Sequence, residues 1–597
     1  MKVISRRILM LLVAAVGAGS ATAASNGFYY DVTYEGPWRN TDDVVTGWDW
    51  TLPPGTAPAL RSGIFNLNSS TPADFPGNHL KQVNAKWRDL EPQNDKYNFG
   101  PLIAEIEDRK YDGAMLNIRG MVWSIDYDSG GLLSSKRTAP DWLSGAEKVQ
   151  ENRKTNVSDP FQITNLEISD PEVKKAFIDF IRAFGEAGIP QHPRLKFMII
   201  HGVSNSLGEE WTGKQEHTGA GAMGEIIDAW LEAFRGVEYK LAWLKPGSLN
   251  DRARAGGAGS RGGAIENWLK YTPEPAVGQS LTSGGYLEVD ESLPEIAENR
   301  HFADQNEEYN AGNHVPRFGS LASWPLRYRH ANLRALQMRR NVLWLDRNST
   351  MNPAMLNWVS LELGQQVHNA PDAWVLLMRS WTKHGGRERE VNNFERWLYQ
   401  RDHGGVTTTP AIRVEHGHNA AGNQLLPKSY WYSDIARSAS NLGIAVDDSF
   451  LSGGPHRVAV KVTYHDLSDG RWSLAYSGST GEKERAVIKR GSGDLRTATF
   501  FLDDFTADAR GTDFDFELRD HRADTPFSFV RLIKLTPGSG SGGGDTGPGP
   551  GPGPGPGPGP GPGPGPGPGP EPGPNPGGEF VPPPAPRPPS ELRTEPG

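Results

Sequence analysis

The chain contains no cysteine in its 597 residues. This absence excludes disulfide bridges, thiolate metal sites and thiol nucleophiles together. A long chain without disulfides must be stabilised by large apolar cores. The length indicates two to four domains, where a barrel of about 250 residues or more counts as one domain.

Long apolar runs are scarce, and the clearest one stands at the start of the chain. A basic beginning with Arg6 and Arg7 precedes an apolar run over 8–16, and small residues follow up to Ala23. This pattern predicts an export signal over 1–24, by either the general or the twin-arginine route. We therefore expect a secreted, periplasmic or cell-envelope protein. No stretch reaches the roughly 20 apolar residues of a membrane helix, so membrane insertion is not expected.

An excess of positive charge is also missing, because the formal net charge is -9. This balance argues against nucleic acid as a partner. No H-E-x-x-H motif occurs, and the histidines over 415–419 have no partner set, so we expect neither a metal nor another cofactor. Tryptophan and tyrosine are frequent, with 18 and 16 copies. Aromatic faces bind sugars, although core packing explains most of them.

The C-terminal third changes character twice. Residues 537–597 are a Gly-Pro-rich tail with almost no apolar side chains, which predicts a disordered spacer and a contact of this tail with the cell envelope. Residues 426–536 contain short alternating runs such as RVAVKVTYHD and RWSLAYSG, which predict an all-β sandwich of a carbohydrate-binding kind. Trp472 is expected in its core. Residues 371–425 fit neither pattern and are interpreted as a connector packed on the preceding domain.

Residues 25–370 alternate short apolar runs with stretches of helical period, which predicts parallel strands covered by helices. Eight candidate strands fit one closed (β/α)8 barrel. The overall prediction is an α/β protein: a TIM barrel, then a small all-β sandwich domain, then the tail. The candidate strands are 62–68, 81–87, 113–120, 195–202, 239–245, 285–291, 301–307 and 341–347, and the candidate helices between them are 171–188, 222–234, 264–271 and 326–340.

The segment KWRDLEPQNDKYNFGPL after the second strand carries a family resemblance. It resembles the W-x-x-L-E-P-x-x-G-x-Y-x-F segment of retaining barrel glycosidases, such as family 42 β-galactosidases and agarases. Asp95 stands where these relatives have glycine. The resemblance implies that Glu91 closes the loop and is not catalytic. The matching residues are Trp87, Glu91, Pro92, Tyr97 and Phe99.

The fourth strand leads into VSNSLGEEW, which places Glu209 and Glu210 beside Trp211. A carboxyl group beside an indole loses hydration, which raises its pKa toward the value that a general acid needs. The resemblance implies an acid/base at this strand end, although the usual Asn-Glu dipeptide is absent. One glutamate of the pair is the predicted proton donor, and the alternative is an exposed loop with two solvated glutamates.

The seventh strand ends in ADQNEEYN, with Glu307, Glu308 and Tyr309. A nucleophilic carboxylate must be ionised and oriented, and a neighbouring tyrosine hydroxyl serves both needs. The resemblance implies that strands four and seven supply a retaining pair, whose carboxyl groups lie about 5 to 5.5 Å apart. A competing nucleophile lies on the sixth candidate strand, at Glu288, Asp290 or Glu291.

The sequence therefore predicts a secreted glycoside hydrolase that cleaves O-glycosidic bonds of a polysaccharide by a retaining two-glutamate mechanism. The alternatives are a non-catalytic polysaccharide-binding protein and a structural cell-envelope protein on the same scaffold. Polar and aromatic residues at the strand ends are the candidates for substrate binding. These candidates are Trp87, Arg119, Trp123, His201, Asn205, Trp211, Tyr309 and Trp344.

Overall fold

The structure of the protein is a computed structural model, and its described residues belong to the unit Met1–Ser539. In this part of the chain, no helix combines the length and the apolar character needed to cross a membrane. The described residues are 44–66, 75–127, 137–143, 149–152, 161–200, 215–243, 248–260, 278–297, 300, 303–306, 324–345, 353–384, 387–415, 432–510 and 513–535.

Eight parallel strands form one sheet, in the order β13-β14-β2-β3-β4-β8-β9-β10. This is the strand order of a (β/α)8 barrel that is opened between its sixth and seventh strands. No backbone pairing among the described residues joins β10 to β13, so the structure shows a partial barrel. The strands are β2 (Gly63–Asn66), β3 (His79–Lys86), β4 (Gly113–Arg119), β8 (Leu195–Ile199), β9 (Leu241–Trp243), β10 (Gly259–Ser260), β13 (Ala303–Asn306) and β14 (Val342–Leu345).

Seven of the eight predicted strands overlap strands of this sheet, and the sixth prediction is wrong. The candidate 285–291 instead contains β12 (Leu287–Val289), which pairs antiparallel with β11 (Gln279–Leu281) in a separate two-stranded sheet. The sixth position belongs to β10, which pairs parallel with β9. Because β10 consists of one glycine and one serine, it has no apolar run by which the sequence could reveal it.

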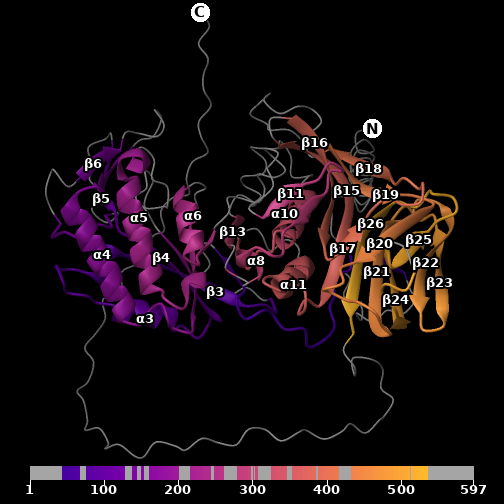
Figure 1. Cartoon of the computed structure of the whole chain (residues 1–597), viewed down its shortest axis with the longest axis horizontal. Helices are drawn as coiled ribbons and strands as arrows, with labels where there is room; N and C mark the ends of the chain where they lie inside the picture. The colour runs from indigo at the N-terminus through magenta and orange to yellow at the C-terminus, as the bar shows by residue number, and fades with distance from the viewer. Residues whose placement is uncertain are drawn as a thin grey trace, which may run out of the picture. The chain divides into compact units, whose positions relative to one another are not determined.

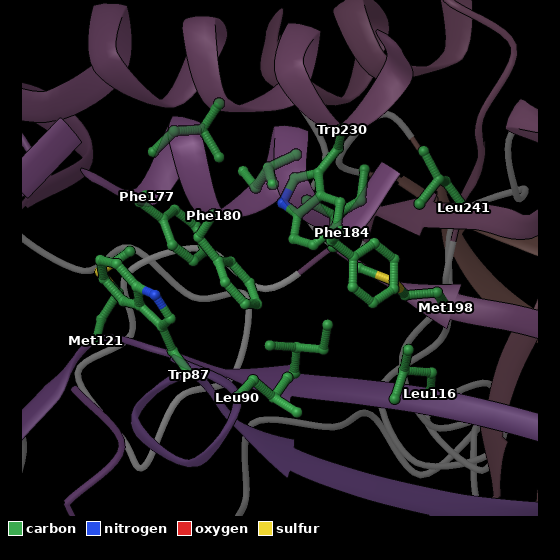
Figure 2. Packing of buried hydrophobic residues seen from close by; sticks show 14 of the residues in the cluster. Trp87, Leu90, Leu116, Met121, Phe177, Phe180, Phe184, Met198, Trp230 and Leu241 are labelled. Carbon is green, nitrogen blue, oxygen red and sulfur yellow. The ribbon is translucent and has the colours of Figure 1, made fainter. Parts of the chain in front are cut away.

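Helices cover one face of the sheet and enclose an aromatic core (Figure 1, Figure 2). The predicted helices 171–188 and 222–234 are confirmed as α4 (Pro171–Glu186) and α5 (Gln215–Ala233). Two further helices contribute to this layer, α3 (Gly100–Ile106) and α6 (Ser248–Ala255). Helix α4 begins at Asp170, whose carboxylate accepts the backbone N–H groups of Glu172 and Val173, both at 2.9 Å. The predicted helix 264–271 lies outside the described residues.

The rings of this core come from three elements. Trp87 lies 4.9 Å from Phe177 between ring centroids, and Phe184 lies 5.6 Å from Trp230. All four side chains are buried. Each buried side chain of this size contributes roughly 2 to 3 kcal/mol through the apolar surface removed from water. We call this apolar cluster behind the parallel sheet the sheet core. It is stabilised mainly by hydrophobic burial.

Two antiparallel sheets form the second half of the structure and pack face to face around an apolar core. The predicted runs RVAVKVTYHD and RWSLAYSG coincide with β21 and β22, and Trp472 is buried as expected. The first sheet contains β1 (Val44–Thr46), β24 (Leu495–Phe505), β21 (His456–His465), β26 (Phe527–Lys534), β15 (Asp372–His384), β16 (Arg387–Arg396), β19 (Tyr432–Ser438) and β18 (Thr409–Glu415); the second contains β17 (Leu398–Gln400), β20 (Asn441–Val446), β25 (Phe516–Arg519), β22 (Asp469–Gly478) and β23 (Gly481–Arg490).

The interpretation of 371–425 as a connector is wrong for its described residues. They form β15, β16, β17 and β18, and β15 pairs with β26 in the middle of the first antiparallel sheet. Side chains along a strand alternate between its two faces. Val375 and Leu377 pack inside the sandwich, whereas Leu376 and Met378 pack on the side of the parallel sheet. Both faces of β15 are buried, so the run lacks the apolar-polar alternation of a surface strand.

A second aromatic core, which we call the junction core, lies between the parallel sheet and the sandwich. Trp48 and Trp50 stack with ring centroids 5.6 Å apart, and Trp50 lies 5.0 Å from Trp358. Phe529 of β26 lies 5.4 Å from Trp50. The helices at this junction are α10 (Trp324–Gln337), which confirms the predicted helix 326–340, and α11 (Pro353–Glu362).

The remaining elements are short. A separate three-stranded antiparallel sheet lies between β4 and α4 along the chain. The elements are β5 (Val122–Tyr127), β6 (Val149–Asn152) and β7 (Phe161–Leu166) in that sheet, together with α2 (Trp87–Leu90), η3 (Glu238–Lys240) and α8 (Pro294–Ala297).

Candidate functional site

The face of the parallel sheet opposite the sheet core carries an apolar layer. Its members come from six different strands and are almost completely buried. Such a layer fills the interior of a (β/α)8 barrel and forms the floor beneath the carboxyl ends of the strands. The layer consists of Phe65, Leu80, Met115, Phe197, Ile199, Ala242 and Val342.

Polar side chains replace this layer toward the carboxyl ends of β3 and β4. Asn84 pairs in register with Asn117, and Lys86 pairs in register with Arg119. Residues that are paired across neighbouring strands point to the same face of the sheet. The two amides are joined by a hydrogen bond of 3.2 Å from Nδ2 of Asn117 to Oδ1 of Asn84. The edge therefore presents one row of amides and one row of cations.

The sequence singled out only Arg119 of these four residues. Asn84, Lys86 and Asn117 were missed, although an alternation of polar residues with Val83 and Ala85 marks them in the sequence. Asn117 is 5% exposed, and its Oδ1 accepts no hydrogen bond from the described residues. Amide groups donate and accept hydrogen bonds, and cations orient carboxylates or bind anionic groups. These are the functions that a sugar-binding floor requires.

The four predicted catalytic glutamates lie outside the described residues. Glu307 and Glu308 directly follow Asn306, the last residue of β13. Glu209 and Glu210 follow β8, which ends at Ile199. By chain order these are the seventh and fourth strands of the parallel sheet.

Four of the predicted substrate-binding residues also lie outside the described residues, namely His201, Asn205, Trp211 and Tyr309. For Trp123 and Trp344 only the backbone is described. Trp344 lies in β14 of the parallel sheet, whereas Trp123 lies in β5 of the three-stranded antiparallel sheet and not at the end of a parallel strand.

Trp87 is a core residue and not a sugar platform. Its side chain is 0% exposed and packs on Phe177 and Phe180 (Figure 2). Its Nε1 donates a hydrogen bond of 2.7 Å to Glu91. An indole that is enclosed on both faces has no surface on which a pyranose ring can stack. The expected binding role of Trp87 is therefore corrected.

Glu91 closes the loop after β3, as the resemblance implied. Its second carboxylate oxygen accepts the backbone N–H of Asp95 at 3.0 Å. Burial raises the pKa of Glu91, while the hydrogen bonds from Trp87 and Asp95 act in the opposite direction. Asp95 itself has a φ of 58°, in the left-handed region. Glycine adopts this conformation most easily and aspartate tolerates it, which accounts for the exchange in the motif.

The competing nucleophile on 285–291 is also corrected. Glu291 accepts a hydrogen bond of 2.8 Å from Nε of Arg339 and one of 3.1 Å from Nε1 of Trp397. Glu291 therefore links the region after the β11–β12 hairpin to Arg339, two residues beyond the end of α10, and to Trp397 of the sandwich. Glu288 belongs to β12, which has no pairing with the parallel sheet. These carboxylates do not stand at the carboxyl edge of a barrel strand.

In the described part of the chain, no group of three or more His, Asp or Glu side chains is placed to hold a metal ion. The chemistry that the edge offers consists of amide hydrogen bonds and cationic charge.

No family model matches the chain, and no curated protein matches it. Among solved structures, the chain is similar to an α-amylase from Malbranchea cinnamomea, with 9% identity, 74% of this chain and 96% of that chain covered, and a TM-score of 0.29. It is also similar to a GH27 β-L-arabinopyranosidase from Geobacillus stearothermophilus, with 9% identity, 77% and 98% covered, and a TM-score of 0.27. We therefore infer the function of this chain only from the strand order and from the residues of the parallel sheet.

Proposed function

We propose that the protein is a glycoside hydrolase that cleaves O-glycosidic bonds of a polysaccharide by a retaining two-glutamate mechanism. One observation carries the proposal: both predicted glutamate pairs follow strands of the same parallel sheet, β8 and β13. Active sites of (β/α)8 enzymes form at the carboxyl ends of the strands. In the barrel order these are strands four and seven, the positions that the resemblance assigns to the acid/base and the nucleophile.

In the proposed reaction, the carboxyl group of Glu209 or Glu210 gives its proton to the bridging oxygen. The carboxylate of Glu307 or Glu308 bonds to the anomeric carbon as the bond to that oxygen breaks. Water then attacks the anomeric carbon and releases the nucleophile. The proton of this water returns to the first glutamate, so both groups regain their starting states.

The rows on β3 and β4 have supporting roles in this proposal. Asn84 and Asn117 bind sugar hydroxyls, because an amide pair offers donors and acceptors at a fixed spacing. Arg119 keeps the nucleophile ionised, since a neighbouring guanidinium lowers the pKa of a carboxyl group. Lys86 stands beside Arg119 and adds to the same positive field.

The test measures reducing sugar released from plant, algal and bacterial polysaccharides by the exported chain and by single Glu→Gln variants. We expect activity to fall by a factor of about 1000 or more in one variant of each pair, Glu209→Gln or Glu210→Gln and Glu307→Gln or Glu308→Gln. Glu288→Gln is the matched control, because it removes the same charge from β12 and should keep full activity.

Two outcomes would contradict the proposal. Polysaccharide binding without any hydrolysis would support the alternative of a non-catalytic binding protein. Hydrolysis that survives all four catalytic substitutions would place the carboxylates elsewhere.

A further inference from the structure

A groove with a volume of about 760 Å³ lies at the amino edge of the parallel sheet, away from the carboxyl ends of the strands. Residues 53–61 form one wall and lead into the first residue of β2. Residues 364–371, between α11 and β15, form the other wall, and Lys534 at the end of β26 closes one side. The groove is therefore separate from the edge that carries Asn84 and Arg119.

The charge of the groove is unlike that of the whole chain. The chain has 71 acidic against 62 basic residues, yet none of the 18 described residues that line the groove is Asp or Glu. Arg61 and Lys534 both line it. The ammonium of Lys534 lies 3.9 Å from the ring of Phe450 and donates to the carbonyl oxygen of His368 at 3.4 Å. Among the described residues, Lys534 forms no ion pair with a carboxylate.

The groove also offers acceptors for hydroxyl groups. Nε2 of Gln365 donates to the carbonyl oxygens of Ala57 and Leu361, at 3.0 and 2.9 Å. Nε2 of Gln366 donates to the carbonyl oxygen of Ala297 at 3.0 Å. These bonds fix the amide planes with the nitrogen toward the protein, and the amide oxygens are the acceptors that remain for a ligand.

The walls are rigid and partly apolar. Pro53, Pro54, Pro58 and Pro371 line the groove, and proline fixes the backbone φ angle. Leu60 stands at the groove with 88% of its surface exposed, and only two other large hydrophobic residues of the described chain are exposed. An exposed leucine on a rigid wall offers an apolar contact to the C–H face of a sugar ring at little entropic cost.

We propose that this groove binds an anionic polysaccharide chain, which carries carboxylate or sulfate groups, at a position separate from the site of cleavage. The cations bind the anionic groups, the amide oxygens accept from hydroxyls, and Leu60 packs on a ring face. An acidic peptide shares the charge but carries no row of hydroxyl donors. Binding at the groove does not depend on hydrolysis, so it is measurable whether or not the proposed activity is found.

The test is affinity electrophoresis of the whole exported chain in gels that contain polygalacturonate, its methyl ester, dextran sulfate or dextran. We expect retardation by one or both anionic polymers and none by their neutral counterparts. Lys534→Gln should raise the dissociation constant about tenfold, and Leu60→Glu should abolish retardation by adding an acid to an acid-free groove. Arg471→Gln is the matched control, because it removes one charge from an exposed position of β22 and should bind nearly as the parent does. Leu60→Gln, which loses the apolar contact without adding a charge, should weaken binding less than Leu60→Glu does.

Three results would overturn the inference: equal retardation by charged and neutral polymers, unchanged binding in both Lys534→Gln and Leu60→Glu, or no retardation in any gel. A further gel with poly-glutamate tests the other class of ligand, and preferential binding of poly-glutamate over both anionic polysaccharides would assign the groove to acidic peptides instead. Thermal midpoints of the variants must match that of the parent, so that a loss of binding is not a loss of folding.

Discussion

The sheet core and the junction core are both rich in large aromatic rings, but they differ in the charges around them. The sheet core contains Trp87, Phe177, Phe180 and Trp230, and the buried Glu91 beside it accepts hydrogen bonds from Trp87 and Asp95. The junction core contains a comparable set of rings and is bordered by fully buried ion pairs. Apolar burial is non-directional, whereas a buried charge requires one particular partner. Both cores therefore stabilise the fold, and the buried ion pairs of the junction core also determine which strands and helices pack against each other.

The ion pairs of the junction join segments that lie far apart in the chain. Lys461 of β21 contacts Asp49, which is 412 residues away. Arg531 of β26 donates to Asp372 at 2.7 Å, across 159 residues. Glu362 of α11 accepts from Arg396 at 2.8 Å. Burial and the neighbouring Asp372 raise the pKa of Glu362 well above its ordinary value.

The largest difference between the cores should appear on acidification. Burial lowers the pKa of His465, on the junction side of β21, to about 3. Its ordinary pKa is about 6.5, so between pH 6.5 and 3 the unfolded chain binds a proton that the folded chain does not. The contribution to the free energy of unfolding is complete above pH 6.5 and falls by the order of 4 to 5 kcal/mol as the pH drops to 3.

Urea unfolding of the parent and of His465→Gln as a function of pH measures this effect. The glutamine keeps a donor for Ser528, which His465 contacts at 2.8 Å. The difference between the two proteins should shrink as the pH falls below 6.5. A difference that stays constant from pH 7 to 4 would mean that His465 does not titrate with unfolding.

A single substitution at the junction should be costly because it isolates a charge. Lys461→Met removes the partner of Asp49, and both side chains are about 1% exposed. We expect a loss of about 3 to 5 kcal/mol in the free energy of unfolding. The double variant Asp49→Asn with Lys461→Met should regain a large part of this loss. Equal stability of the single and double variants would argue against the ion pair as the cause.

The sheet core should tolerate a change of shape much better. Phe180→Leu keeps an apolar side chain among Trp87, Phe99 and Phe184, and we expect a loss of about 1 to 1.5 kcal/mol. The measurement is again the free energy of unfolding in urea. A loss as large as that of Lys461→Met would remove the contrast between the two cores.

The sequence predicted the parallel strands well where they are apolar and separated by helical periods, as in β4 and β8. It missed β10, whose two residues are not apolar. It also placed β12 in the parallel sheet, although β12 pairs with β11 in a separate antiparallel hairpin. It also failed at β15, because burial on both faces hides the alternation of a sheet strand. The resemblance implied the loop role of Glu91, and both partners of its carboxylate, Trp87 and Asp95, lie within the motif.

The candidate site was predictable in part for the same reason. Glu307 and Glu308 directly follow the predicted seventh strand, and their catalytic role stays a prediction. The amide pair of Asn84 and Asn117 was not predicted, because it depends on the register between two strands that are 33 residues apart. The buried ion pairs of the junction were equally unpredictable, because no local sequence pattern identifies Asp372 as the partner of Arg531.

We propose that a glutamate after β13 forms a covalent glycosyl-enzyme, and azide rescue of an alanine variant measures this step. On a polysaccharide that the parent cleaves, Glu307→Ala or Glu308→Ala should lose activity, because no carboxylate attacks the anomeric carbon. Azide should restore turnover in that variant and yield a glycosyl azide of inverted configuration. Full activity in both variants without azide would contradict the claim.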